Sequence, residues 1–161
     1  MSEEDLVKSF IKSDNSPDGK WFVEVPAGLS IQENADTTPA VKHVDAVCIT
    51  SKRFALPESY PEGPEYYFNV QAAEPHISKA EIFRRIRDSQ HLSNETVSIV
   101  EAKTGRSSFK AIGQLEAYKY LIEEDYGWDV EEQILLSKDR DEIIDSVCSE
   151  KDYRVVNVDT K

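Results

Sequence analysis

A glutamate and a lysine stand two positions apart at the end of an apolar, β-branched segment. Residues 97–103 read Val-Ser-Ile-Val-Glu-Ala-Lys, and this composition predicts a strand. Side chains of a strand alternate between its two faces, so Glu101 and Lys103 share one face. A carboxylate beside an ammonium can bind a hard cation and stabilise negative charge that develops in a reaction.

Two polar side chains lie four residues apart in the helix that is predicted after a short turn. This spacing places Gln114 and Tyr118 on one helix face, and Lys110 shares that face because it lies four residues before Gln114. Gln114 can donate and accept hydrogen bonds, so it can hold a water molecule, Lys103 or a phosphate oxygen. Gly113 lacks a side chain, and we expect it where the helix approaches the sheet closely.

An acid interrupts a second apolar segment upstream. Residues 41–50 are almost continuously apolar or β-branched, which is typical of a strand covered on both faces. Asp45 lies in the middle of this segment. A buried carboxylate is costly unless it is paired or bound to a metal, so Asp45 is a candidate for a site.

The ordered combination of Asp45, Glu-x-Lys at 101–103 and Gln-x-x-x-Tyr at 114–118 resembles the PD-(D/E)XK nuclease superfamily, in its QxxxY subgroup. The resemblance covers about residues 21–137, with residues 51–96 as an insertion. It implies an αβββαβ core with a mixed sheet flanked by helices. It also implies Mg²⁺ or Mn²⁺ as the cofactor and DNA, or else RNA, as the substrate.

Hydrolysis of a phosphodiester requires a nucleophilic water and stabilisation of negative charge on phosphorus, and divalent metal ions supply both. Mg²⁺ prefers oxygen ligands, which Asp45, Glu101 and the carbonyl of Ala102 would provide. Lys103 would orient the attacking water or stabilise the transition state. The resemblance implies the same roles for the two acids and the lysine, with Gln114 in a catalytic role beside them.

Each feature also has an ordinary interpretation. A Glu-x-Lys pair at a strand end is common on solvated surfaces, and Tyr118 could be a core residue with a solvated hydroxyl. The long separation of the two acids in the sequence leaves Glu65 or Glu74 as an alternative partner for Glu101. Glu24 is a possible third acid, for which an exposed strand position is the simpler interpretation.

Additional basic residues could hold the phosphate backbone of a nucleic acid, and such contacts position a protein without reading sequence. Candidates next to the predicted helix are Lys110, Arg106 and Tyr118. A further helix, with a capping-box pattern at 78–81, turns Ile82, Phe83 and Ile86 inward and carries four bases, Lys79, Arg84, Arg85 and Arg87. The alternative is that these four bases lie in solvent and form ion pairs with acidic residues.

Hydrophobic periodicity and turn chemistry predict the remaining elements. We expect helices at 3–13 (capped by Ser2 and Asp5), at about 108–125 (capped by Ser107 or Ser108 and ended by Gly127) and at 139–148 (capped by Asp139), and strands at 21–25, 132–137 and 153–158, with a possible strand at 66–72. This order predicts a single α/β domain over residues 1–161, with a mixed sheet and helices on both faces.

The chain is strongly acidic, with 31 acids, 19 bases and a net charge of −12. The excess lies mainly in residues 116–152, which hold 13 acids and 4 bases, whereas residues 51–110 hold 8 acids and 9 bases. We favour a surface adapted to high salt, because self-repulsion keeps such a protein soluble. The other interpretations are a polyanion mimic and a protein that is simply acidic.

The composition indicates a globular protein of the cytoplasm. Hydrophobic residues make up 39% of the chain, but no run approaches the roughly 20 apolar residues of a membrane span. The first residues lack the basic and apolar regions of a signal peptide. Cys48 and Cys148 both lie in apolar contexts, and we expect two reduced, buried thiols.

Two alternatives to an active nuclease remain. One is an inactive binding module of the same fold, or a subunit of a larger DNA-processing complex. The other is an acidic DNA mimic, which requires a contiguous carboxylate stripe over residues 123–145.

Cutting both strands of a duplex takes two sites, so we also expect a homodimer that uses part of residues 51–90. Aromatic residues gather in that segment and either form this interface or cover the chain's own sheet; they are Phe54, Tyr60, Tyr66, Tyr67 and Phe68.

Overall fold

The structure, a computed structural model, describes residues 2–31, 42–51, 79–89, 93–106 and 108–158. One five-stranded sheet in the order β1-β2-β3-β4-β5 forms its centre. The strands are β1 (Lys20–Ala27), β2 (Lys42–Ile49), β3 (Thr96–Arg106), β4 (Asp129–Asp139) and β5 (Arg154–Asn157). The helices are α1 (Glu3–Ile11), α3 (Lys79–Ser89), α4 (Phe109–Tyr126) and α5 (Glu142–Glu150).

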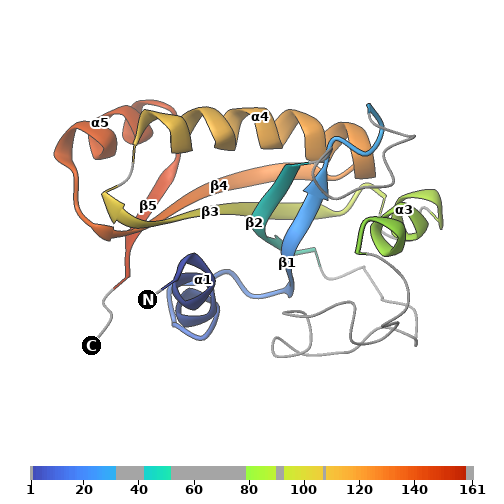
Figure 1. Ribbon diagram of the computed structural model, residues 1–161, viewed down its shortest axis with the longest axis horizontal. Helices are drawn as coiled ribbons and strands as arrows, with labels where there is room; N and C mark the ends of the chain where they lie inside the picture. The colour runs from blue at the N-terminus through green and yellow to red at the C-terminus, as the bar shows by residue number, and fades with distance from the viewer. Residues whose placement is uncertain (1, 32–41, 52–78, 90–92, 107, 159–161) are drawn as a thin grey trace.

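The sheet is mixed. β1, β2 and β3 are antiparallel neighbours, whereas β3, β4 and β5 run parallel and are connected through α4 and α5. Figure 1 shows α4 and α5 on one side of the sheet and α1 on the other. The predicted α/β class, with helices flanking a mixed sheet in the predicted order, is confirmed.

The core consists of the apolar strand residues and the helix faces packed on them. β2 is buried from Ala46 to Ile49, as its continuous apolar sequence predicted. Aromatic rings join α3 and α4 to the sheet, because Phe83 contacts both Phe22 and Tyr126, and Tyr126 stacks on Trp128 at 4.3 Å between ring centroids. Cys48 and Cys148 are free, buried thiols, as expected.

Most helix ends follow the sequence signals. Ser2 and Asp5 form the predicted capping box of α1, and Gly127 ends α4 in the left-handed conformation with φ 68°. The predicted start of α5 was wrong. Asp139 still belongs to β4, where it pairs with Arg106 of β3, so the helix begins later and Asp141 caps it by accepting two backbone N–H groups.

Part of the predicted insertion can be compared with the structure. The helix expected after the capping-box pattern is α3, and Phe83 and Ile86 are buried as predicted. Three other predictions lie outside the described residues. They concern the side chain of Ile82, the possible strand at 66–72 and the aromatic residues between positions 52 and 68. None of the described helices combines the length and the apolar character needed to cross a membrane.

A buried carboxylate fixes the turn that follows β1. Asp125, near the end of α4, is 4% exposed. Its Oδ2 accepts the backbone N–H groups of Gly28 at 2.7 Å and Leu29 at 3.1 Å, and its Oδ1 accepts that of Ser30 at 2.9 Å. These three bonds tie the edge strand β1 to α4 across the fold, and Gly28 supplies the φ of 98° that the turn requires.

We expect the substitution Asp125→Ala to lower the free energy of unfolding by about 3 kcal/mol, because it leaves buried N–H donors without an acceptor. Chemical denaturation measures this change. The matched control is Glu131→Ala, which removes an exposed carboxylate and should cost less than about 0.5 kcal/mol. Equal unfolding curves for the two variants would show that Asp125 does not hold the turn.

Candidate functional site

The two strands that carry the predicted acids separate at the site. The ladder between β2 and β3 ends at the pair Ala46–Val100, whereas the ladders β1–β2 and β3–β4 continue past this point. We call the opening beyond the Ala46–Val100 pair the fork. Asp45 and Glu101 are the first residues of their strands inside it. The sheet thus brings together two acids that are far apart in the sequence.

Asp45 replaces part of the missing ladder with its side chain. Its Oδ2 accepts the backbone N–H of Ala102 at 2.7 Å. The N–H and C=O of one strand residue point to the same neighbour, so the carbonyl of Ala102 also faces the fork. Asp45 and the carbonyl that was predicted to act with it are therefore on the same side of β3.

Asp45 and Glu101 lie opposite each other just beyond the Ala46–Val100 pair, and their carboxyl groups interact directly, so the pair favours a state with one proton. Glu101 is only 3% exposed. Burial, together with the negative charge of Asp45, raises the pKa of Glu101 to about 9. Burial also raises the pKa of Asp45, although the hydrogen bond from Ala102 opposes that shift. Without a bound cation, the pair therefore keeps a proton at neutral pH.

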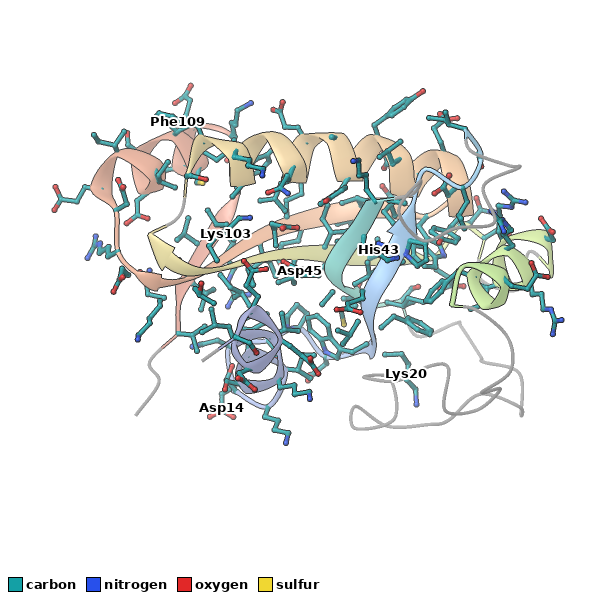
Figure 2. The ribbon with its side chains drawn as sticks, in the orientation of Figure 1. Asp14, Lys20, His43, Asp45, Lys103 and Phe109 are labelled. Atoms are coloured by element: carbon teal, nitrogen blue, oxygen red, sulfur yellow. The ribbon has the colours of Figure 1, made fainter. Side chains whose placement is uncertain are left out.

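Lys103 provides the cationic group of the site. Its Nζ lies 3.8 Å from Oε1 of Glu101, and its side chain is 21% exposed. The lysine thus reaches the buried acid from the solvent side, on the strand face that alternation predicted. Figure 2 shows the side chains of Asp45 and Lys103 beside β3.

Gln114 and Tyr118 project from α4 toward the same acids. Burial, followed by the charges of Glu101 and Asp45, raises the pKa of Tyr118 to about 12. Tyr118 therefore stays neutral, and at 7% exposure it lies too deep to contact a nucleic acid directly. Its burial therefore does not support the predicted contact with a nucleic acid.

Two buried acceptor atoms at the site receive no hydrogen bond within the described part of the chain. They are Oε2 of Glu101 and Oε1 of Gln114. Buried acceptors are normally satisfied, and oxygens of this kind fit a cation or an ordered water. No three His, Cys, Asp or Glu side chains of the described residues form a group able to hold an ion. A site of two carboxylates and a carbonyl still suits Mg²⁺, which usually keeps several waters and binds substrate phosphates.

The remaining predicted contacts are spread more widely. Lys110 is exposed in the first turn of α4, four residues before Gln114. Arg106 ends β3, and its side chain, like that of Lys79, lies outside the described residues. The structure does not bring Glu24 into an acid cluster, and this residue is exposed on β1.

The basic residues of α3 lie on a helix that packs against β1 and α4, close to the start of β3 (Figure 1). Arg84 is half-buried. Arg85 pairs with Glu81 at 3.6 Å and Arg87 with Asp88 at 3.0 Å. These two ion pairs join arginines of α3 to acids of the same helix, and a role in holding phosphate stays a prediction.

The structure also corrects the expectation for Gly113 and adds one residue to the site. Apart from its chain neighbours and the backbone of its own helix, no described atom lies within 4 Å of the position that a Cβ on Gly113 would occupy, so a close approach of helix and sheet does not explain this glycine. Glu3, at the start of α1, adds a negative charge that raises the pKa values of Asp45 and Glu101. Its only sequence signal was the acidic first turn of α1, which capping explains equally well.

Comparison with known proteins gives no match, whether with protein-family models, with curated proteins or with solved structures. The chemistry of the site is therefore inferred from the side chains and backbone groups at the fork.

The shared proton predicts how stability depends on pH. In the folded protein Glu101 keeps its proton up to about pH 9, whereas in the unfolded chain it ionises near its ordinary value of 4.5. The metal-free protein should therefore lose stability as pH rises between these values. Glu101→Gln mimics the neutral acid and removes this loss. We expect it to raise the melting temperature by on the order of 5 °C at pH of about 8.5, and by little at pH of about 5.

Thermal unfolding in the presence of a chelator at several pH values measures this difference. The exposed acid Glu131 provides the control, since Glu131→Gln should leave the pH dependence of the parent unchanged. A Glu101→Gln variant whose melting temperature follows the parent at every pH would contradict the proton-sharing pair.

Proposed function

We propose that the protein is a metal-dependent nuclease that hydrolyses phosphodiester bonds, with DNA as its substrate. The observation that carries the proposal is the fork. Two carboxyl groups, a backbone carbonyl and a lysine meet where β2 and β3 separate. Burial of such a pair costs stability, and a function for the site accounts for that cost.

The arrangement supports the proposed relationship to the PD-(D/E)XK nucleases. The two acids, the lysine and the glutamine occur in the order that the resemblance requires, on two adjacent strands and the helix that follows. The confirmed element order and the mixed sheet are consistent with the core that this family would have. The family assignment rests on these features together.

Asp45, Glu101 and the carbonyl of Ala102 would hold one Mg²⁺ or Mn²⁺ ion. The fit rests on the donor set, since all three are oxygen ligands, and on the unsatisfied Oε2 of Glu101. When bound, the ion supplies a nucleophilic water at neutral pH and stabilises charge on the phosphate. To hold the ion, the two acids would release the proton of the pair to solvent, so that both carboxylates could serve as ligands.

Lys103 and Gln114 act on the reacting groups. The ammonium of Lys103 is partly solvated and can donate to the attacking water or to a phosphate oxygen, where it stabilises the charge of the transition state. Gln114 offers its unsatisfied Oε1 as an acceptor for a proton of that water. Lys110 and Arg106, at the ends of the neighbouring elements, would contact adjacent phosphates of the strand.

The acidity of the chain bears on the conditions under which it would act. A net charge of −12 repels a polyanion, and at molar salt screening over about 3 Å reduces that repulsion. We therefore propose an enzyme adapted to high salt. The two free buried thiols, Cys48 and Cys148, suit the reducing cytoplasm.

A cleavage assay tests the proposed activity. Plasmid, linear and single-stranded DNA are incubated with the protein and Mg²⁺, in salt from low to about molar concentration. We expect cleavage that Glu101→Ala and Lys103→Ala each reduce by at least about 100-fold, because each removes a group that acts in the transition state. Lys119→Ala, which removes an exposed lysine of α4, is the control and should cleave like the parent. If no substrate is cleaved, or if all variants cleave equally well, the proposed nuclease activity is refuted.

Calorimetry with Mn²⁺ tests the metal site separately from cleavage. The parent should bind the ion, and Asp45→Asn should abolish binding, because it replaces a charged ligand and disturbs the acceptor of the Ala102 N–H. Glu131→Gln again serves as the control. Undiminished binding by Asp45→Asn would place the ion elsewhere. Binding at the fork without cleavage of any DNA would favour the inactive binding module.

A further inference from the structure

The outward face of α4 carries an apolar stripe. Phe109 and Tyr120 are 64% and 58% exposed, and Gly113 and Ala117 between them are also exposed. Successive spacings of four, four and three residues place all four on one side of the helix. The opposite side, which includes Leu115 and Ile122, is buried against the sheet. Figure 1 shows α4 as an outer layer, and Figure 2 labels Phe109 at its start.

Gly113 is the part of this stripe that the chain's own packing leaves unexplained. Glycine in a helix interior destabilises the helix relative to alanine. Apart from its chain neighbours and the backbone of α4, no described residue lies within 4 Å of the position that its Cβ would occupy, so an alanine would fit there without a clash. A glycine at this position would allow the surface of another molecule to approach the backbone of α4 closely.

We propose that α4 packs antiparallel against α4 of a second copy of this chain, around a two-fold axis near Ala117. In this register Tyr120 of each copy covers Gly113 of the other, so a large side chain meets the one position that lacks a side chain. Phe109 then lies beside Tyr120 of the other copy. Gly113 and Ala117 allow the two helix axes to approach closely, and a two-fold contact of this kind is self-complementary.

The charges on α4 favour the antiparallel arrangement. Lys110 is exposed near the start of the helix and Glu124 near its end, so antiparallel packing brings each lysine close to the glutamate of the other copy. The Glu116 residues of the two copies approach each other near the two-fold axis. Each of them already forms an ion pair with Lys151 of its own chain. A nucleic acid fits this face poorly, because the second half of α4 is acidic and the whole chain has a net charge of −12.

This pairing differs from the homodimer expected from the sequence, which used residues 51–90. It leaves the fork open, because Gln114 and Tyr118 leave α4 on the side that faces the sheet. It does engage Lys110, so in the dimer the proposed phosphate contact beside α4 falls to Arg106 alone. A contact between two single helices is at the small end of specific interfaces, so we expect a dissociation constant in the micromolar range.

Analytical ultracentrifugation of the full chain, without metal or nucleic acid, tests the pairing. Samples up to about 500 µM are compared at about 0.15 M and about 1 M NaCl, since the higher salt screens repulsion between the acidic chains. We expect a monomer–dimer equilibrium in the parent. Gly113→Leu and Tyr120→Ser should each raise the dissociation constant at least about tenfold, whereas Ile143→Ser, which removes another exposed apolar residue (67% exposed), should leave it unchanged.

A charge exchange tests the register. Lys110→Glu should weaken the dimer, and the double variant Lys110→Glu with Glu124→Lys should restore it. Circular dichroism of each variant checks that the helix is retained. A parent that is monomeric at both salt concentrations, a Gly113→Leu variant that dimerises like the parent, or a double variant without recovery would each overturn the proposal. None of these measurements depends on the proposed nuclease activity.

Discussion

The hydrogen bond from the backbone N–H of Ala102 to the carboxylate of Asp45 is the contact on which the candidate site depends. Separation of β2 and β3 removes ladder hydrogen bonds, and a buried N–H without an acceptor is costly. The side chain of Asp45 supplies that acceptor, so the sheet can open at this point. The same bond orients Asp45 toward Glu101, and the carbonyl of Ala102 faces the same opening. One side-chain contact thus stabilises the fork and assembles its oxygen donors.

The electrostatics of the fork oppose stability. Burial and mutual repulsion keep a proton between Asp45 and Glu101, Glu3 adds a further negative charge, and Lys103 is the cation that reaches the pair. Contacts elsewhere offset this cost, among them the aromatic rings that join α3 and α4 to the sheet and the three hydrogen bonds to Asp125. A buried, electrostatically unfavourable pair of this kind marks a candidate functional site.

Local patterns predicted the elements and the faces of their side chains. The apolar runs of β2 and β3 were identified from composition, and strand alternation placed Glu101 beside Lys103. The fork itself could not be predicted, because the end of a ladder depends on hydrogen bonds between strands that are distant in sequence. The same reason explains the error at α5, since the pairing of Asp139 with Arg106 extends β4. The role expected for Gly113 failed because helix periodicity alone did not separate the outward face of α4 from the packed one.

A crystal structure of the protein with Mn²⁺, with the ion located by its anomalous scattering, tests the central claim most directly. The account predicts one ion in the fork, with oxygen ligands from Asp45, Glu101 and the carbonyl of Ala102 at about 2.1 Å. It also predicts that Lys103 and Gln114 lie next to the ion without ligating it. A saturated crystal with no ion between β2 and β3, or with Mn²⁺ bound only to acids elsewhere on the surface, would contradict the account.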